Sequence, residues 1–199
     1  MRGEHAPASI SKMTIMKIKH MIAVSLLLLT GIRTANAVEW QMKQGPMMTP
    51  WSETLDPENV LGEYPRPQME RQEWMNLNGI WDLRKAIQDE AYSPDFIYDK
   101  KILVPFPLES AISGVMEESD NQCYWYRRTL TIPESMKGKN ILLHFDAVDW
   151  KAIVYVNGKK VGRHTGGYDP FHFDITSALT EGGEQEIAVY IHDNTGADG

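Results

Sequence analysis

Cysteine is almost absent from this sequence, because Cys123 is the only one among 199 residues. A single cysteine excludes an intrachain disulfide, so other interactions must hold the fold together. No histidine or basic cluster adjoins Cys123 in the sequence to activate its thiol. We therefore expect Cys123 to be a small, buried, unreactive side chain.

Basic residues are also scarce, with 20 Lys and Arg against 27 Asp and Glu and a formal net charge of −7. Proteins that bind nucleic acid or an anionic membrane usually carry an excess of positive charge. We expect neither partner.

The chain lacks an apolar run near the roughly 20 residues that a membrane-spanning helix needs. The short apolar run 21–29 follows Lys17 and Lys19 and precedes the small residues Ala35-Asn36-Ala37. A basic start, a short apolar core and an Ala-x-Ala ending are typical of a secretory signal peptide. The sequence therefore predicts a signal peptide helix in residues 1–37, cleavage after Ala37, a secreted or periplasmic protein, and no membrane span in the mature chain. The alternative is a buried helix.

Helical periodicity is almost missing after residue 37, whereas proline is frequent in residues 38–72. Proline excludes long helices and central strands there. We expect an extended N-terminal arm over 38–72, anchored by Trp40 and Trp51.

Beyond the arm, short segments alternate between apolar and polar residues, most clearly over 123–132 and 185–193. We count about seven to nine such segments separated by turn signals, a pattern typical of an all-β antiparallel sandwich or jelly roll. The expected domain is 73–199.

The stretch 141–175 carries the strongest local signals. Asn157-Gly158 follows a β-branched and aromatic segment and predicts a type I′ hairpin between 151–156 and 159–164. Gly166-Gly167 allows a sharp turn or a close backbone approach. Asp174 suits the N-cap of a short helical turn over 175–179.

Four blocks from this region occur in a distinctive order and spacing. They are Phe-Asp-Ala-Val at 145–148, Val-Asn-Gly-Lys at 156–159, Gly-Gly-Tyr-Asp-Pro-Phe at 166–171 and Asp-Ile-Thr at 174–176. Together with Tyr-Pro-Arg-Pro at 64–67 and Trp-Tyr-Arg-Arg at 125–128, they resemble the N-terminal sugar-binding domain of glycoside hydrolase family 2. That family includes β-galactosidases, β-glucuronidases and β-mannosidases. The resemblance covers about residues 64–193 and implies a jelly-roll, galactose-binding-like sandwich.

The resemblance also implies a reaction that this chain does not perform alone. The family retains anomeric configuration with two glutamates of a later (β/α)₈ barrel, and such a barrel needs about 250 residues. The family's Asn-Glu acid/base pair occurs nowhere in this sequence. Five aspartates lie in or near predicted loops, Asp146, Asp149, Asp169, Asp174 and Asp193, but no motif makes a catalytic pair of them. We expect no catalytic residue here and no independent activity.

Four residues are candidates for contact with a sugar. In the family, a polar residue at the end of the last strand reaches the barrel's substrate pocket, and Asp193 and Asn194 occupy that place; the alternative is an Asx turn. Tyr168 and Trp150 are candidates for stacking on a sugar ring, with core or interdomain packing as the alternative. No metal-ligand spacing is present, and we expect no cofactor, although a cation in the full-length enzyme stays open.

The leading hypothesis is therefore the non-catalytic N-terminal domain of a secreted or periplasmic β-glycosidase. Its expected partners are a carbohydrate substrate and a downstream catalytic domain. The alternative is a free-standing carbohydrate-binding module. A third hypothesis, an adhesin-like sandwich without a sugar function, keeps only the fold.

Overall fold

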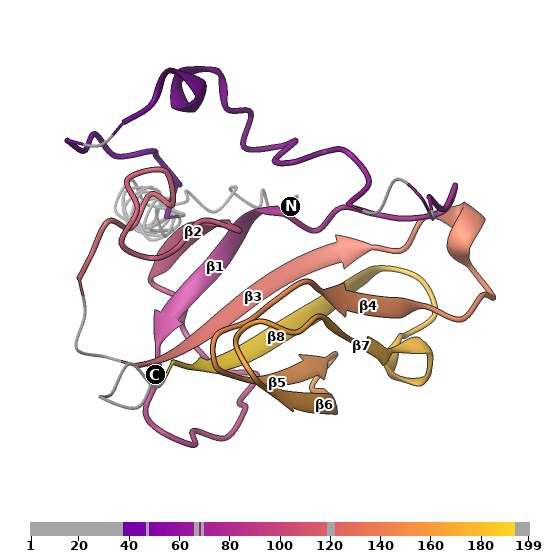
Figure 1. The fold of residues 1–199 in the computed structure, drawn as a ribbon. Helices are drawn as coiled ribbons and strands as arrows, with labels where there is room; N and C mark the ends of the chain where they lie inside the picture. Colours follow the sequence, from indigo (N-terminus) through magenta and orange to yellow (C-terminus); the bar gives the residue numbers. More distant parts are fainter. Residues whose placement is uncertain (1–37, 47, 66–67, 69, 119–121, 194–199) are drawn as a thin grey trace, which may run out of the picture. The chain divides into compact units, whose positions relative to one another are not determined.

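The structure is a computed structural model that describes residues 38–46, 48–65, 68, 70–118 and 122–193. The predicted signal peptide and cleavage site lie outside these residues, as does Asn194. The described residues form antiparallel β-structure with three short 3₁₀ turns, which confirms the predicted all-β fold class (Figure 1). Among them, no helix has the length and apolar character needed to cross a membrane.

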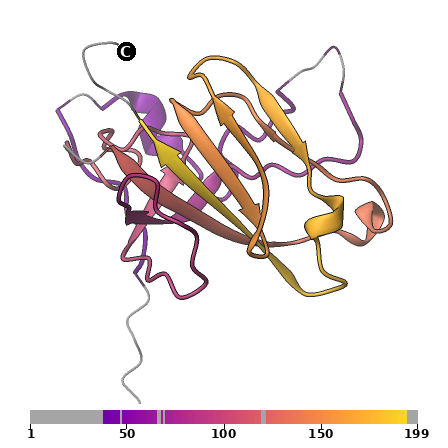
Figure 2. The ribbon, with the colours of Figure 1, turned by 90° about the horizontal axis from the view of Figure 1, so that it is seen from below.

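Eight strands are present in the described residues. They are β1 (Gly79–Lys85), β2 (Lys100–Val104), β3 (Cys123–Thr131), β4 (Leu142–Phe145), β5 (Lys151–Val156), β6 (Lys159–Thr165), β7 (Phe171–Asp174) and β8 (Glu184–His192). The 3₁₀ turns are η1 (Pro50–Thr54), η3 (Glu134–Met136) and η4 (Thr176–Ala178). Six strands form one sheet in the order β2-β1-β3-β8-β5-β6, and β4 pairs with β7 in a second. Neighbouring strands of the larger sheet are rotated relative to one another, which gives the sheet its usual twist (Figure 2).

The alternating pattern sends side chains of each central strand to two different cores. On one face, residues such as Leu83, Val154 and Val189 pack with Leu143 of β4, and Phe173 of β7 packs against them. On the other face, Trp125 and Tyr190 are fully buried beneath the aromatic residues of the loop 86–99. Cys123 belongs to this second core and is buried, as predicted.

The two sheets approach each other closely at Gly162 of β6. A Cβ at this position would lie 2.1 Å from the ring of Phe173 on β7. Only a glycine leaves space for that ring, so the sandwich packing depends on this position.

The hairpin between β5 and β6 confirms the Asn-Gly prediction. Asn157 and Gly158 both have positive φ, at 48° and 76°, as a type I′ turn requires. The predicted helical turn is shorter, since η4 covers Thr176–Ala178 with Ile175 at the N-cap position. The predicted N-cap role of Asp174 is therefore wrong, but its carboxylate accepts from the Thr176 amide at 2.9 Å and closes an Asx turn one residue before the N-cap.

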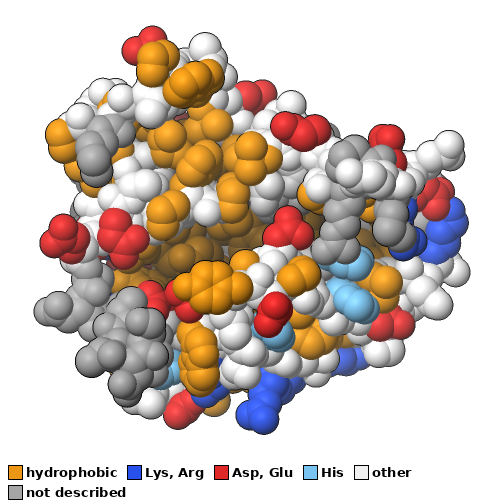
Figure 3. Space-filling model, viewed as in Figure 1, with side chains coloured by type: hydrophobic (Ala, Val, Ile, Leu, Met, Phe, Trp, Pro, Cys, Tyr) orange, Lys and Arg blue, Asp and Glu red, His pale blue; other side chains and the backbone are white. Residues whose placement is uncertain are grey.

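The arm lies beside the loop that follows β2 (Figure 1). Trp40 donates its indole Nε1–H to the Ser113 carbonyl at 2.7 Å, and the Lys43 ammonium donates to the Val115 carbonyl at 2.9 Å. Trp40 therefore anchors the arm as expected. The same prediction for Trp51 is wrong, because that side chain is 79% exposed on η1. Figure 3 shows apolar side chains gathered on this part of the surface.

Candidate functional site

Three of the predicted site residues lie at one end of the strands of the six-stranded sheet. Trp150 immediately precedes β5, Asp193 immediately follows β8, and Tyr168 lies in the loop between β6 and β7. Lys151 of β5 pairs with both Thr165 and His192. The start of β5 and the ends of β6 and β8 therefore meet at the same place, as antiparallel neighbours must.

Backbone hydrogen bonds tie these loops together. The Trp150 amide donates to the His192 carbonyl at 3.3 Å, and the Gly166 amide donates to the Trp150 carbonyl at 2.8 Å. The Asp193 amide donates to the Gln122 carbonyl at 2.8 Å. These bonds fix the backbone of Trp150 and Asp193 at the ends of β5 and β8, as a site built on strands requires.

Two further carboxylates act on Asp193. Burial raises the pKa of the Asp193 carboxyl, and the negative charges of Asp149 and Glu109 raise it further, while His192 lowers it. Glu109 comes from the loop after β2, far from Asp193 in sequence. We call Glu109, Asp149, Trp150, Tyr168 and Asp193 the acidic rim.

The aromatic residues of the acidic rim are accessible. Tyr168 is 96% exposed and Trp150 is 42% exposed. Core packing, one alternative for Tyr168, is therefore wrong within this domain. Exposed rings and carboxylates at the same end of the sheet offer the two contacts that sugars use, an apolar face for C–H groups and acceptors for hydroxyl groups.

Glycine shapes the loop that presents Tyr168. Gly166 has φ of +129°, in the region that favours glycine. Gly167 lies against Asp149, because a Cβ there would be 2.7 Å from the carboxylate Oδ1. The close approach expected for Gly166-Gly167 is thus made with a residue of the acidic rim.

His164 supports the same loop from the core side. Its ring stacks on Phe171 with centroids 4.2 Å apart. Its Nε2 is buried and has no hydrogen-bond partner among the described residues. This packing holds His164 in place just before the glycine pair, so we interpret His164 as a residue that supports the loop.

Sequence reasoning did not connect Glu109 or Asp149 with Asp193. Asp149 was one of five loop aspartates, and Glu109 follows a Pro-Phe-Pro-Leu segment without any polar motif. Within the part of the chain that the structure describes, no three His, Cys, Asp or Glu side chains are placed to hold a metal ion. The acidic rim therefore offers hydrogen-bond acceptors rather than a preformed metal centre.

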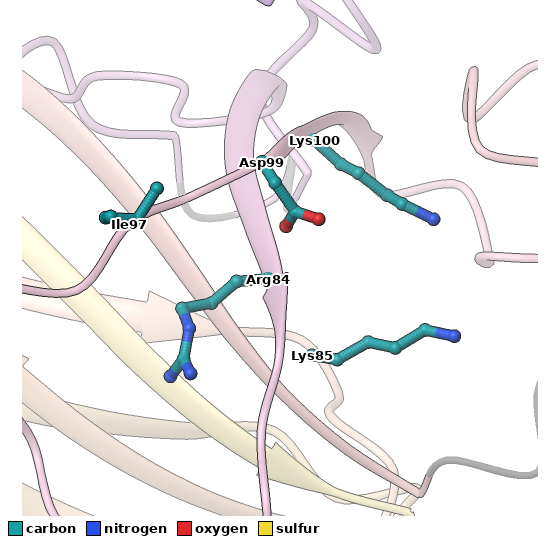
Figure 4. Close-up of a pocket in the computed structure, with 5 residues that line it drawn as sticks. All are labelled: Arg84, Lys85, Ile97, Asp99 and Lys100. Atoms are coloured by element: carbon teal, nitrogen blue, oxygen red, sulfur yellow. The ribbon is translucent and has the colours of Figure 1, made fainter.

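A shallow pocket of about 420 Å³ lies elsewhere, between β1, β2 and the loop before β2 (Figure 4). It is lined by Arg84, Lys85, Ile97, Asp99 and Lys100. Two of its cations are already paired, Arg84 with Glu90 at 2.7 Å and Lys100 with Glu117 at 2.5 Å. None of the predicted site residues lines this pocket, and we do not assign a ligand to it.

Comparison with characterised proteins agrees with the fold described above. The chain is 36% identical over 121 residues to a beta-galactosidase of Thermoanaerobacter pseudethanolicus, covering 59% of this chain and 16% of that protein. It is 26% identical over 135 residues to a beta-glucuronidase of Paenibacillus borealis, covering 65% of this chain and 22% of that protein. The chain thus spans less than a quarter of the length of these relatives.

The solved structure of a Ruminococcus gnavus beta-glucuronidase in complex with C6-substituted uronic isofagomine shares the fold. It superposes with a TM-score of 0.54 at 20% identity, over 66% of this chain and 23% of that one. The family model for the sugar binding domain of family 2 glycosyl hydrolases matches residues 65–197. The chain therefore belongs to glycosyl hydrolase family 2, and these residues are its N-terminal sugar-binding domain.

Proposed function

We propose that this chain is the non-catalytic N-terminal part of a secreted or periplasmic, retaining β-glycosidase. In this proposal the acidic rim borders the substrate pocket of a catalytic barrel that follows the sugar-binding domain. The domain packs on that barrel and contributes hydrogen-bond acceptors and an aromatic surface, while the reacting glutamates belong to the barrel.

The family of the chain and its short length relative to other members support this assignment of roles to two domains. The relatives are named beta-galactosidase and beta-glucuronidase, and the chain spans only 16% and 22% of their length. A barrel of about 250 residues cannot be formed by a chain whose described residues build a β-sandwich. The chain also lacks the Asn-Glu pair that carries the acid/base in the family.

The observation that carries the proposal is that the segments carrying Trp150, Tyr168 and Asp193 meet at one end of the six-stranded sheet. The charges of Asp149 and Glu109 act on Asp193 there, and both aromatic rings are exposed. Burial and neighbouring negative charge disfavour the charged form of Asp193. Donors such as sugar hydroxyls would relieve this cost by hydrogen bonding to the carboxylate. The acidic rim forms only one side of a sugar-binding site. Its affinity for a sugar should rise when a catalytic domain encloses the sugar from the other side.

An assay of aryl β-glycoside hydrolysis tests the proposal. We expect the purified chain to give no turnover above buffer. A polypeptide that continues past Gly199 through the following coding sequence should hydrolyse the same substrates with retention of configuration. Turnover by the 199-residue chain alone would refute the non-catalytic role.

The 96% exposure of Tyr168 also fits a free-standing carbohydrate-binding module. That function predicts measurable affinity of this chain alone for a glycan. Calorimetric titration with plant and host glycans separates the two functions, because a domain that only borders a barrel pocket should show little affinity by itself.

A further inference from the structure

The outer face of the β4–β7 sheet carries a pair of histidines. His144 of β4 lies directly opposite His172 of β7 in the antiparallel register. The ring centroids are 5.1 Å apart with planes inclined by 31°, and both residues are exposed. Figure 3 shows histidine side chains at the surface over these two strands.

The hydrogen-bond pattern brings these two side chains close together. Ile175 donates its amide to the Ile141 carbonyl at 2.9 Å, so 141 and 175 form a hydrogen-bonded pair. Hydrogen-bonded and non-hydrogen-bonded pairs alternate along an antiparallel ladder. His144 and His172 therefore form a non-hydrogen-bonded pair, the kind whose Cα atoms are only about 4.5 Å apart and whose side chains are nearest.

The separation of the rings suits chelation of one metal ion. With a metal–nitrogen bond of about 2.1 Å, an imidazole centroid lies roughly 3.2 Å from the ion. Two centroids 5.1 Å apart then subtend about 105° at the ion. This angle lies between the roughly 90° of tetragonal Ni²⁺ or Cu²⁺ sites and the tetrahedral angle of about 109° that zinc adopts. Rotation about the Cβ–Cγ bonds, a broad and soft torsion, lets the rings turn nitrogen atoms toward a shared ion.

We propose that His144 and His172 form a two-histidine site for a divalent transition-metal ion. Imidazole nitrogen suits Cu²⁺, Ni²⁺ and Zn²⁺, which bind such donors more tightly than the earlier divalent metals of the series. Water completes the coordination, since the described residues offer no group of three ligands. The ion bridges β4 and β7 and thereby fastens the small sheet that covers the first hydrophobic core.

Titration calorimetry with Ni²⁺ alone, on the full chain without a histidine tag at about pH 7.5, tests the site. Metal ions bind the neutral form of imidazole, so the titration is made at neutral to slightly basic pH. We expect one ion per chain at this site. His144→Gln and His172→Gln should each weaken binding at least tenfold, and the double variant should be hardly weaker than either single one, because a chelate needs both ligands.

Two controls test whether Ni²⁺ binds specifically to the pair His144 and His172. The double variant His5→Gln/His20→Gln should retain the affinity, because those residues precede the sugar-binding domain. Ni²⁺ should also raise the melting temperature of the unsubstituted chain but not that of either β4–β7 variant, because an ion that binds only the folded site stabilises it. Binding that survives the loss of either His144 or His172, or no binding at millimolar Ni²⁺, would overturn the proposal.

Discussion

Gly167 lies so close to Asp149 that a Cβ added to the glycine would be 2.7 Å from the carboxylate Oδ1. The loop that presents Tyr168 is thus fitted against a residue of the acidic rim. Gly167→Ala should displace either the loop or the carboxylate and lower the stability by about 1–3 kcal/mol, the usual cost of overpacking. Chemical denaturation of the variant measures this loss.

The double variant Gly167→Ala/Asp149→Ala is the matched control. Removing the carboxylate should restore most of the lost stability, because it removes the atom with which the new methyl group collides. An unchanged stability of Gly167→Ala would show that the contact is not tight.

Tyr168 is expected to matter for activity and not for folding. The variant Tyr168→Ala removes an exposed ring, so the free energy of unfolding should change by less than about 0.5 kcal/mol. In a polypeptide that also carries the proposed catalytic barrel, kcat/KM for an aryl β-glycoside should fall about tenfold, equivalent to about 1.4 kcal/mol. Trp51→Ala removes another exposed aromatic side chain, outside the acidic rim, and should leave kcat/KM unchanged.

The raised pKa of Asp193 predicts how the rim responds to pH. Burial first, and then the charges of Asp149 and Glu109, raise this pKa. The folded protein therefore gains stability from Asp193 as pH falls through the raised folded value toward the ordinary value of about 3.9. Asp149→Asn should lower the pKa of Asp193, as followed by NMR titration of the carboxyl carbon. Asp146→Asn removes an exposed charge that is not among those shifting this pKa, so it should leave that titration nearly unmoved.

Asp82 on β1 predicts the opposite dependence on pH. Its cross-strand neighbours are Lys101 on β2 and Arg127 on β3, and they donate to its carboxylate at 2.6 Å and 2.8 Å. Burial alone would raise the pKa of Asp82, but the hydrogen bonds and charges of both cations outweigh it and lower the pKa. Asp82 thus stabilises the fold above the unfolded pKa of about 3.9, and this stability is lost as pH falls through the lower folded value.

The variant Asp82→Asn should therefore cost about 1–2 kcal/mol at neutral pH, and the difference from the original chain should shrink in strong acid. Urea unfolding at several pH values measures it. Exposed Asp95→Asn serves as the control, and an equal cost at all pH values would contradict the ionic origin.

Asn157 holds the β5–β6 hairpin to β8. Its amide nitrogen donates to Gln185 Oε1 at 2.7 Å and to the Ala178 carbonyl at 3.0 Å, and its side-chain oxygen accepts from the Glu186 amide at 2.9 Å. Asn157→Ala breaks all three bonds and places alanine at a positive φ. We expect a loss of about 2–3 kcal/mol in thermal or chemical unfolding. Asn140→Ala, at an exposed position between η3 and β4, should change stability by less than about 0.5 kcal/mol.

The local signals in the sequence predicted the strands well. The alternation over 123–132 became β3 and that over 185–193 became β8, because a period of two is a property of each segment. The turn at Asn157-Gly158 was predictable for the same reason, since it depends on two adjacent residues. Trp51 was predicted wrongly because a large apolar residue carries no local sign of whether another element covers it.

The sequence by itself determined the β-class, the hairpin and the family resemblance, since these follow from the order and spacing of neighbouring residues. Only the tertiary structure decided that Glu109 and Asp149 act on Asp193 and that His144 faces His172. Such contacts depend on which strands pair and in which register. Pairing of distant strands is settled by the burial of all the apolar faces together, so no short segment contains the information.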